Sequence, residues 1–149
     1  MKIFLLIPAF LFLFAFCDDD PGMEDAAVLL TIENGTDEPV YAFVDLNKKQ
    51  LTPKDYSGLT VYGDDVRLLD GGESTQFDFT QGDFLYRPYA TVMFFKESTV
   101  KRFSKDEIIA GDVYDLCINL TYSDLSLYGF RVVYHGESHW QEQQNEALR

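Results

Sequence analysis

Short strand-like segments, separated by frequent turn residues, follow one another along most of this chain. In residues 28–33, Val28, Leu30 and Ile32 fall on one face and polar residues on the other, which is the period-two pattern of a half-buried strand. Strand patterns occur at residues 28–33, 40–44, 59–62, 66–69, 74–80, 86–95, 114–120 and 130–134. We therefore predict a mainly β fold with about seven strands.

Two of these segments are apolar on both faces. Residues 40–44 read VYAFV, and residues 86–95 contain the run YATVMFF, so each is predicted to be a strand that is covered on both sides. Residues 74–80 instead place Phe77 and Phe79 inward and polar residues outward, which indicates an edge strand. The pattern favours an antiparallel two-sheet sandwich of immunoglobulin-like architecture. A partly open barrel and an α+β sheet with one covered face remain alternatives.

One or two short helices are expected as connectors. Ser104 and Glu107 form a capping-box pattern, Ile108 and Ile109 are expected to face the core, and Gly111 is expected to end the helix in the left-handed conformation. The other predicted connections are helical turns at 98–103 and 122–128, a loop at 45–58, and turns at 63–65, 70–73 and 81–83.

The N-terminal segment has the pattern of an export signal. Lys2 precedes an uninterrupted apolar run, Ile3–Phe16, which ends at Cys17. A charged start and a short apolar run are typical of a secretory signal peptide. The run is shorter than the ~20 apolar residues that span a bilayer, so a permanent transmembrane helix is disfavoured.

A cysteine at the end of such a run resembles a bacterial lipoprotein signal. The resemblance implies that Cys17 becomes the lipidated first residue of the mature chain and tethers it to a membrane. Phe16 is bulkier than the small residue that the pattern has there, a departure compatible with the looser signals of the Bacteroidota. Asp18, Asp19 and Asp20 resemble the acidic tag that directs some lipoproteins of that phylum to the outer leaflet of the outer membrane. A solvated linker is the other interpretation of these aspartates, and it is compatible with the tag. Ordinary secretion, with cleavage further along the chain, is the alternative to lipid anchoring.

The predicted organisation is one domain behind a leader. It comprises a signal peptide at 1–16, an acidic tether at 17–26, a β-sandwich domain at 27–136 and a polar C-terminal tail at 137–149. The net charge of −13 becomes −14 once Lys2 is removed with the signal. This charge repels nucleic acid and anionic headgroups, so we expect no nucleic-acid partner. A basic protein, a cation or a neutral glycan is a better match to this negative charge as a partner.

Cys117 is the only thiol left if Cys17 carries lipid, so no disulfide is expected. Within its predicted strand it lies between Asp115 and Asn119, and a negative neighbour raises the pKa of a thiol, which opposes reactivity. We interpret Cys117 as a small filler residue and not as a nucleophile.

The sequence predicts no metal site and no cofactor. His135, Glu137 and His139 offer three donors within five residues, but Gly136 lies where a strand is ending, and a solvated strand end is favoured. Candidate calcium ligands at Asp64–Asp65, Asp18–Asp20 and Asp106–Glu107 lack the spacing of a calcium loop. Paired carboxylates for glycoside hydrolysis remain open, because sequence separation does not fix spatial separation.

Two further motifs have ordinary explanations. Asn34-Gly35-Thr36 and Asn119-Leu120-Thr121 match the glycosylation acceptor pattern and are interpreted as chance matches. Aromatic residues could form a binding platform, although half-buried sheet positions are favoured for most of them. The platform candidates are Tyr56, Tyr62, Tyr86, Tyr122, Tyr128 and Trp140.

The segments ATVMFF, STVKRFSKDEII, GDVYDLCINLTYSDL and GFRVVY resemble the C-terminal half of small uncharacterised lipoproteins of the Bacteroidales. TIENGTDEPVY and LDGGESTQFDF resemble their opening strands. The resemblance implies no catalytic residue. We therefore expect a non-enzymatic, lipid-anchored protein of the cell envelope, in the outer membrane, which serves as a binding or accessory module. Surface display is one alternative, because the leaflet that carries the anchor stays open. A small cell-surface hydrolase that uses paired carboxylates is the alternative.

Overall fold

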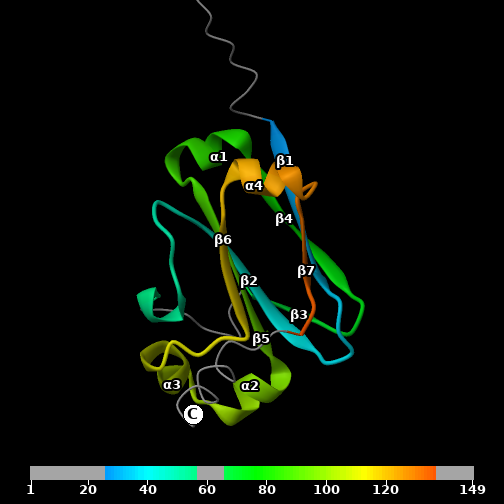
Figure 1. The fold of residues 1–149 in the computed structure, drawn as a ribbon, viewed down its shortest axis with the longest axis vertical. Helices are drawn as coiled ribbons and strands as arrows, with labels where there is room; N and C mark the ends of the chain where they lie inside the picture. The colour runs from blue at the N-terminus through cyan, green and yellow to red at the C-terminus, as the bar shows by residue number, and fades with distance from the viewer. Residues whose placement is uncertain (1–25, 57–65, 137–149) are drawn as a thin grey trace, which may run out of the picture.

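The computed structural model describes residues 26–56 and 66–136, and this part of the chain contains seven strands in two sheets. The three-stranded sheet has the order β4-β1-β7, and the four-stranded sheet has the order β3-β2-β5-β6 (Figure 1). This arrangement confirms the predicted mainly β, two-sheet sandwich. The strands are β1 (Ala27–Asn34), β2 (Val40–Asn47), β3 (Val66–Leu69), β4 (Ser74–Thr80), β5 (Tyr89–Lys96), β6 (Leu116–Leu120) and β7 (Arg131–Tyr134).

Strand pairing is antiparallel except for one pair. β1 and β7 run parallel, with Thr31 opposite Arg131 and Asn34 opposite Tyr134. The edge position predicted for residues 74–80 is confirmed, since β4 pairs with β1 alone in its sheet. The immunoglobulin-like part of the prediction is not confirmed. Immunoglobulin sheets hold their strands in the orders ABED and CFG, whereas the orders here are 4-1-7 and 3-2-5-6.

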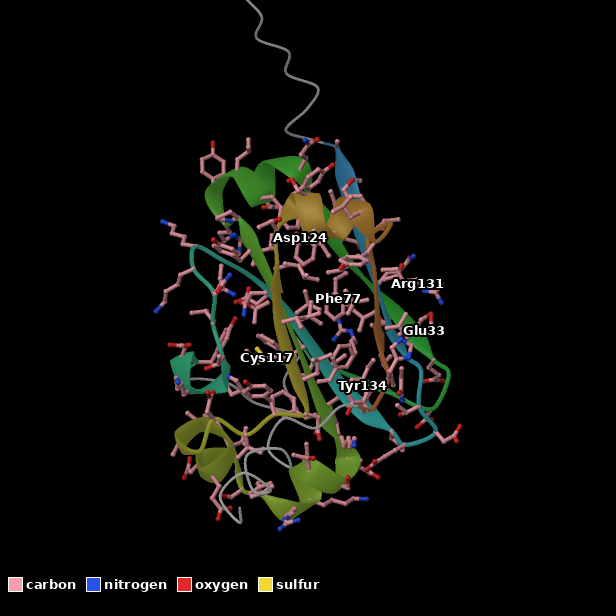
Figure 2. All side chains as sticks on the ribbon, in the orientation of Figure 1. Glu33, Phe77, Cys117, Asp124, Arg131 and Tyr134 are labelled. Carbon is pink, nitrogen blue, oxygen red and sulfur yellow. The ribbon has the colours of Figure 1, made fainter. Side chains whose placement is uncertain are left out.

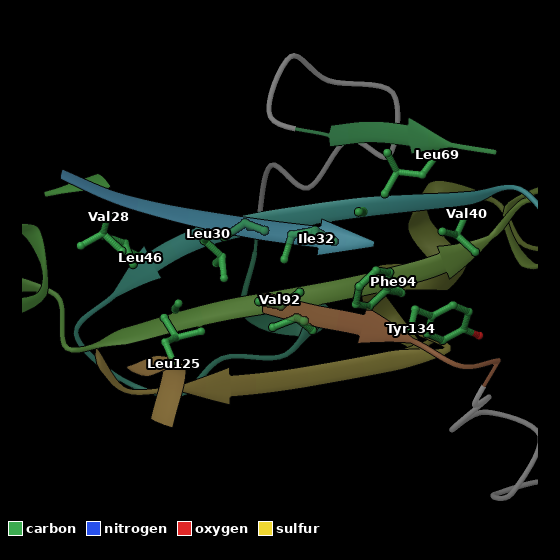
Figure 3. Packing of buried hydrophobic residues seen from close by; sticks show 14 of the residues in the cluster. Val28, Leu30, Ile32, Val40, Leu46, Leu69, Val92, Phe94, Leu125 and Tyr134 are labelled. Atoms are coloured by element: carbon green, nitrogen blue, oxygen red, sulfur yellow. The ribbon is translucent and has the colours of Figure 1, made fainter. Parts of the chain in front are cut away.

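The main core lies between the two sheets (Figure 3). From β1 it takes Val28, Leu30 and Ile32, whose side chains are at most 4% exposed, as their period-two spacing predicts. Phe94 of β5 and Tyr134 of β7 stack across the sandwich, with ring centroids 4.9 Å apart and an interplanar angle of 19°. The stacked rings therefore connect the four-stranded sheet directly to the three-stranded one.

A second apolar cluster covers the outer face of the four-stranded sheet. Phe43 of β2 and Met93 and Phe95 of β5 pack there against Val100 and Ile108, which belong to two short helices. This third layer explains why β2 and β5 are apolar on both faces. Their predicted coverage on both sides is confirmed, and the helices supply the cover on the outer side.

The described part of the chain has four short α-helices and a 3₁₀ turn, more than the one or two helices predicted. Residues 81–83, predicted as a turn, are the first turn of a helix. Thr80 caps that helix, because its hydroxyl accepts from the Asp83 amide while the Asp83 carboxylate accepts from the Thr80 amide. The elements are η1 (Pro53–Asp55), α1 (Gln81–Tyr86), α2 (Glu97–Arg102), α3 (Lys105–Ala110) and α4 (Tyr122–Leu127).

The capping box of α3 is confirmed, but the predicted role of Gly111 is wrong. Ser104 and Glu107 exchange both cap hydrogen bonds. Gly111 has φ −86°, and Asp112 is the residue with positive φ, at 51°. A Cβ at Gly111 would lie 2.8 Å from the Glu107 carbonyl oxygen, so glycine is required here for space and not for handedness.

The structure also differs from the prediction at the starts of three strands. β5 begins at Tyr89 because Tyr86 still belongs to α1, and β6 begins at Leu116 because its ladder with β5 extends only from Leu116, opposite Phe94. Phe130 precedes β7 with φ 55°, after Gly129 with φ 62°, so this pair ends α4 as a left-handed turn. Phe130 is therefore not part of the strand that was predicted at 130–134.

The connection predicted as a loop at 45–58 is shorter than expected. β2 continues to Asn47, which pairs with Tyr89, because the ladder with β5 extends along the whole strand. Gly72 has φ 77°, which confirms the turn at 70–73. The strand predicted at 59–62 and the turn at 63–65 lie outside the described residues.

Candidate functional site

The predicted anchor residues lie outside the described part of the chain. This applies to Cys17 and to Asp18, Asp19 and Asp20. The first described residue is Ala26, whose carbonyl oxygen accepts a hydrogen bond from the Gln81 amide at 2.9 Å. The chain therefore enters the sandwich beside the first residue of α1, at the end of the molecule where α1 and α4 lie (Figure 1).

Helices α1 and α4 have the same start. Thr80 and Thr121 occupy the N-cap positions, and Asp83 and Asp124 stand three residues later. The Asp83 and Asp124 carboxylates accept from the amides of their threonines at 2.8 and 2.9 Å. Hydrogen bonds from the Thr80 amide and hydroxyl lower the pKa of Asp83, and those from the Thr121 hydroxyl and amide lower the pKa of Asp124. Both helices connect one sheet to the other at this end.

Aromatic side chains join the two helices underneath. The ring of Phe84 from α1 meets the ring of Tyr122 from α4 edge-on, with centroids 5.6 Å apart. Phe79 contacts Phe84 at 6.1 Å, and Phe130 contacts Tyr122 at 5.4 Å. This row of rings packs on the main core and fixes the helices relative to each other.

The outward side of the same end carries exposed apolar residues. Leu85 and Tyr86 at the end of α1 are 66% and 71% exposed, and Leu127 and Tyr128 at the end of α4 are 84% and 66% exposed. We call these four residues the α1/α4 patch. Leu85 and Tyr86 lie where α1 leads into the four-stranded sheet, and Leu127 and Tyr128 lie where α4 leads into the three-stranded sheet, so the two pairs flank this end of the sandwich. Large apolar side chains that are this exposed are candidates for an interaction site. This patch is the candidate functional site.

Sequence reasoning found only half of the patch. Tyr86 and Tyr128 were candidates for an aromatic platform, whereas Leu85 and Leu127 were not singled out. A signal for all four was present. The segments TQGDFLY and TYSDLSLY both start with Thr-x-x-Asp and end with Leu-Tyr.

The other platform candidates do not join this surface. Tyr122 is half-buried between Phe84 and Phe130. Tyr56 is half-buried against Phe43, and its hydroxyl accepts from the Asn47 side chain at 2.7 Å. Burial raises the pKa of Tyr56 to about 12. Tyr62 and Trp140 lie outside the described residues.

Cys117 is half-buried and hydrogen-bonded within the fold. It lies on β6, and its Sγ donates to the Leu51 carbonyl oxygen at 3.4 Å (Figure 2). Burial raises the pKa of the Cys117 thiol to about 12, and the charges of Asp112 and Asp55 add to the effect. The predicted direction of the pKa shift is confirmed. Its main cause is burial, and Asp115, the predicted cause, does not contribute. That residue instead accepts from the Lys96 amide at 2.7 Å.

Among the described candidates for metal or acid chemistry, Glu107 serves the fold, and its neighbour Asp106 is exposed. Glu107 caps α3, and no group of three His, Cys, Asp or Glu side chains within 26–56 and 66–136 is placed to hold a metal ion. His135 follows β7, and its ring lies beside Gly35, which follows β1 of the three-stranded sheet, whereas Cys117 belongs to the other sheet. Glu137, His139, Asp64 and Asp65 lie outside the described residues.

Both glycosylation-like asparagines are internal anchors. Asn34 is fully buried, and its side-chain amide donates to the carbonyl oxygens of Glu38, Leu69 and Asp70 at 2.8, 3.1 and 3.2 Å. Asn119 is half-buried and bonds the Leu51 backbone in both directions. Both amide groups are therefore committed to the fold, which agrees with the interpretation of the two motifs as chance matches.

Comparisons with known proteins find no matching family model, curated relative or solved structure. Within the residues that the structure describes, no helix is long and apolar enough to cross a bilayer.

Proposed function

We propose that this chain is a lipid-anchored protein of the bacterial cell envelope whose sandwich serves as a binding or accessory module. The observation that carries the proposal is the position of Cys17, directly after the apolar run Ile3–Phe16 and directly before three aspartates. Modification of Cys17 would hold the mature chain at a membrane without a spanning helix. The resemblance to small lipoproteins of the Bacteroidales supports an anchor in the outer membrane, and the acidic triplet at 18–20 supports display at the cell surface.

We assign no reaction to the domain. Of the groups that the sequence offered for chemistry, Cys117 is a thiol with a raised pKa, and Glu107 caps α3. With a net charge of −13 for the whole chain, a basic protein or a neutral glycan suits this surface as partner better than a nucleic acid.

Metabolic labelling with palmitate tests the anchor. We expect the wild-type protein to incorporate label and to fractionate with membranes, because Cys17 receives acyl chains. The Cys17→Ser variant should lose the label and leave the membrane fraction. Cys117→Ser is the matched control, because it removes the other cysteine and should keep both properties. Membrane association of an unlabelled Cys17→Ser protein at the wild-type level would contradict the proposal.

A further inference from the structure

Asn34 and Gly35 form the only Asn-Gly pair of the chain. In a flexible peptide such a pair is the most favourable setting for deamidation of asparagine, because glycine has no side chain to hinder attack by its own backbone nitrogen. Asn34 is the last residue of β1, and it is fully buried. The folded state therefore determines whether this reaction can take place.

Deamidation at this pair would proceed through a cyclic imide. Hydroxide removes the proton from the Gly35 backbone nitrogen, and the nitrogen then attacks Cγ of Asn34. A C–N bond forms at Cγ while the bond from Cγ to Nδ2 breaks, and the departing nitrogen takes a proton from water and leaves as ammonia. Water then opens the imide at one of its two carbonyl carbons. The product is aspartate or isoaspartate, and no oxidant or reductant takes part.

The native fold opposes each part of this reaction. The Gly35 N–H donates to the Tyr134 carbonyl oxygen at 2.9 Å, so loss of its proton would also break the bond that joins the ends of β1 and β7. The Asn34 Nδ2 donates to three backbone carbonyl oxygens, and its Oδ1 accepts from the Thr36 amide and hydroxyl at 3.0 and 2.8 Å. These bonds hold the side chain in one orientation. Asn34 is 0% exposed, so bulk water does not reach the leaving group.

Most of this protection comes from contacts with distant parts of the chain. Leu69 and Asp70, two of the acceptors of the Asn34 amide, are 35 and 36 residues away in the sequence, and Tyr134 belongs to the last strand. Unfolding removes these contacts together, exposes the Asn-Gly pair to water and frees the Gly35 nitrogen. The rate of deamidation should therefore follow the population of molecules in which this site is open.

The products of the reaction do not fit the native site. An aspartate at position 34 has no donor for the carbonyl oxygens that Nδ2 contacts. An isoaspartate adds a carbon to the backbone between position 34 and Gly35. In the native fold, the Asn34 N–H donates to the Glu73 carbonyl oxygen, and the Asn34 carbonyl oxygen accepts from the Gly72 amide, both at 2.9 Å. With the longer backbone, Gly35 cannot keep its bond to Tyr134 while position 34 keeps these two.

We propose that Asn34 is a deamidation site that the native fold protects, that it reacts when the domain unfolds, and that its products prevent the chain from refolding. Unfolding that lasts long enough for the reaction thus becomes irreversible through a covalent change at one residue. The extent of deamidation then reports how long a molecule has been unfolded. This inference is independent of the proposed lipid anchor.

Peptide mapping by mass spectrometry tests the protection. The full-length protein is incubated at mildly alkaline pH with a reductant, either in buffer or in urea that unfolds it. We expect Asn34 to deamidate at least about tenfold faster in urea than in buffer. The other asparagines serve as internal controls with slower reaction in urea, because none precedes glycine: Asn47, Asn119 and Asn145. Equal rates at Asn34 in buffer and in urea would overturn the protection.

A substitution of Gly35 tests the chemistry in the unfolded chain. Gly35→Ala places a methyl group beside the attacking nitrogen, so in urea it should slow the reaction at Asn34 by at least about fivefold. The comparison is made in urea because a Cβ at Gly35 would lie 2.9 Å from the Tyr134 carbonyl oxygen and disturb the native fold. An unchanged rate at Asn34 would overturn attack by the Gly35 nitrogen.

Refolding after the incubation tests the consequence. Wild-type protein is kept in urea at alkaline pH for increasing times and then diluted into buffer, and circular dichroism measures the fraction that regains the native fold. We expect the fraction that fails to refold to equal the fraction deamidated at Asn34. Incubation in urea at mildly acidic pH is the matched control, because the chain is unfolded there but hydroxide is scarce, and it should refold in full. Deamidated molecules that refold with the wild-type urea midpoint, or equal losses at both pH values, would overturn the proposed consequence.

Discussion

Replacing Asn34 with aspartate is expected to destabilise the domain strongly at neutral pH. The Asn34 side-chain nitrogen donates to three backbone carbonyls in a fully buried site, two of them at Leu69 and Asp70. Asn34→Asp would place a carboxylate oxygen against these acceptors, without a donor and out of reach of water. We expect a loss of about 3–5 kcal/mol in the free energy of unfolding at pH 7, as for other buried charges without a partner.

The pH dependence of this loss identifies its cause. Burial beside carbonyl oxygens should raise the pKa of the introduced carboxyl above its unfolded value of about 4. The protonated form is then favoured in the folded state, so Asn34→Asp should be least destabilising below about pH 4 and lose stability as the pH rises through the raised value. Asn34→Ala is the control, because it removes the same hydrogen bonds but cannot titrate. Urea unfolding of both variants and the wild type at acidic and neutral pH measures the difference. Parallel pH profiles for the two variants would contradict this explanation.

Replacing Tyr134 with alanine should lower the free energy of unfolding by a similar amount, for a different reason. Its ring is fully buried and stacks on Phe94 across the two sheets at 4.9 Å. Tyr134→Ala would leave a cavity between the sheets and is expected to cost about 3–5 kcal/mol. Tyr134→Phe keeps the stacked ring and should cost much less. Chemical denaturation measures both, with Tyr128→Ala as the matched control, because Tyr128 is 66% exposed and should shift stability by no more than about 0.5 kcal/mol. A Tyr134→Ala domain as stable as the control would show that the ring stack does not join the sheets.

The strands could be predicted from the sequence because their spacing follows directly from burial. Val28, Leu30 and Ile32 alternate with exposed or half-buried neighbours, and this pattern alone locates β1 and its inner face. Apolar residues on both faces of β2 and β5 correctly indicated cover on both sides. Periodicity indicates that a residue is buried but does not indicate which element buries it. The sequence therefore did not predict that α2 and α3 pack on the outer face of the four-stranded sheet.

The helices were harder to predict because each has only six residues. A helix of that length shows too few turns for a periodic pattern, so its cap is the main signal. Ser104 and Glu107 gave that signal for α3. The equivalent Thr80–Asp83 pattern was interpreted as a turn, since aspartate at the third position also suits turns. Phe130 was assigned to a strand because no local rule predicts positive φ for an aromatic residue.

The candidate site could be predicted only in part. Tyr86 and Tyr128 are aromatic and are candidates for a surface platform, but the exposure of these residues and of their neighbours Leu85 and Leu127 depends on how α1 and α4 pack on the core. For Cys117 the direction of the pKa shift was predicted from neighbouring acids, whereas its main cause is burial under the segment that carries Leu51. Both cases depend on contacts between residues that are distant in sequence.

The intact mass of the protein extracted from cell envelopes tests the central claim most directly, namely that Cys17 is a lipidated N-terminus. The account predicts a chain that begins at residue 17 and carries the additional mass of a diacylglyceryl group and any further acyl chain on Cys17. A mature chain that begins at another residue, or one that begins at residue 17 without added lipid mass, would contradict it.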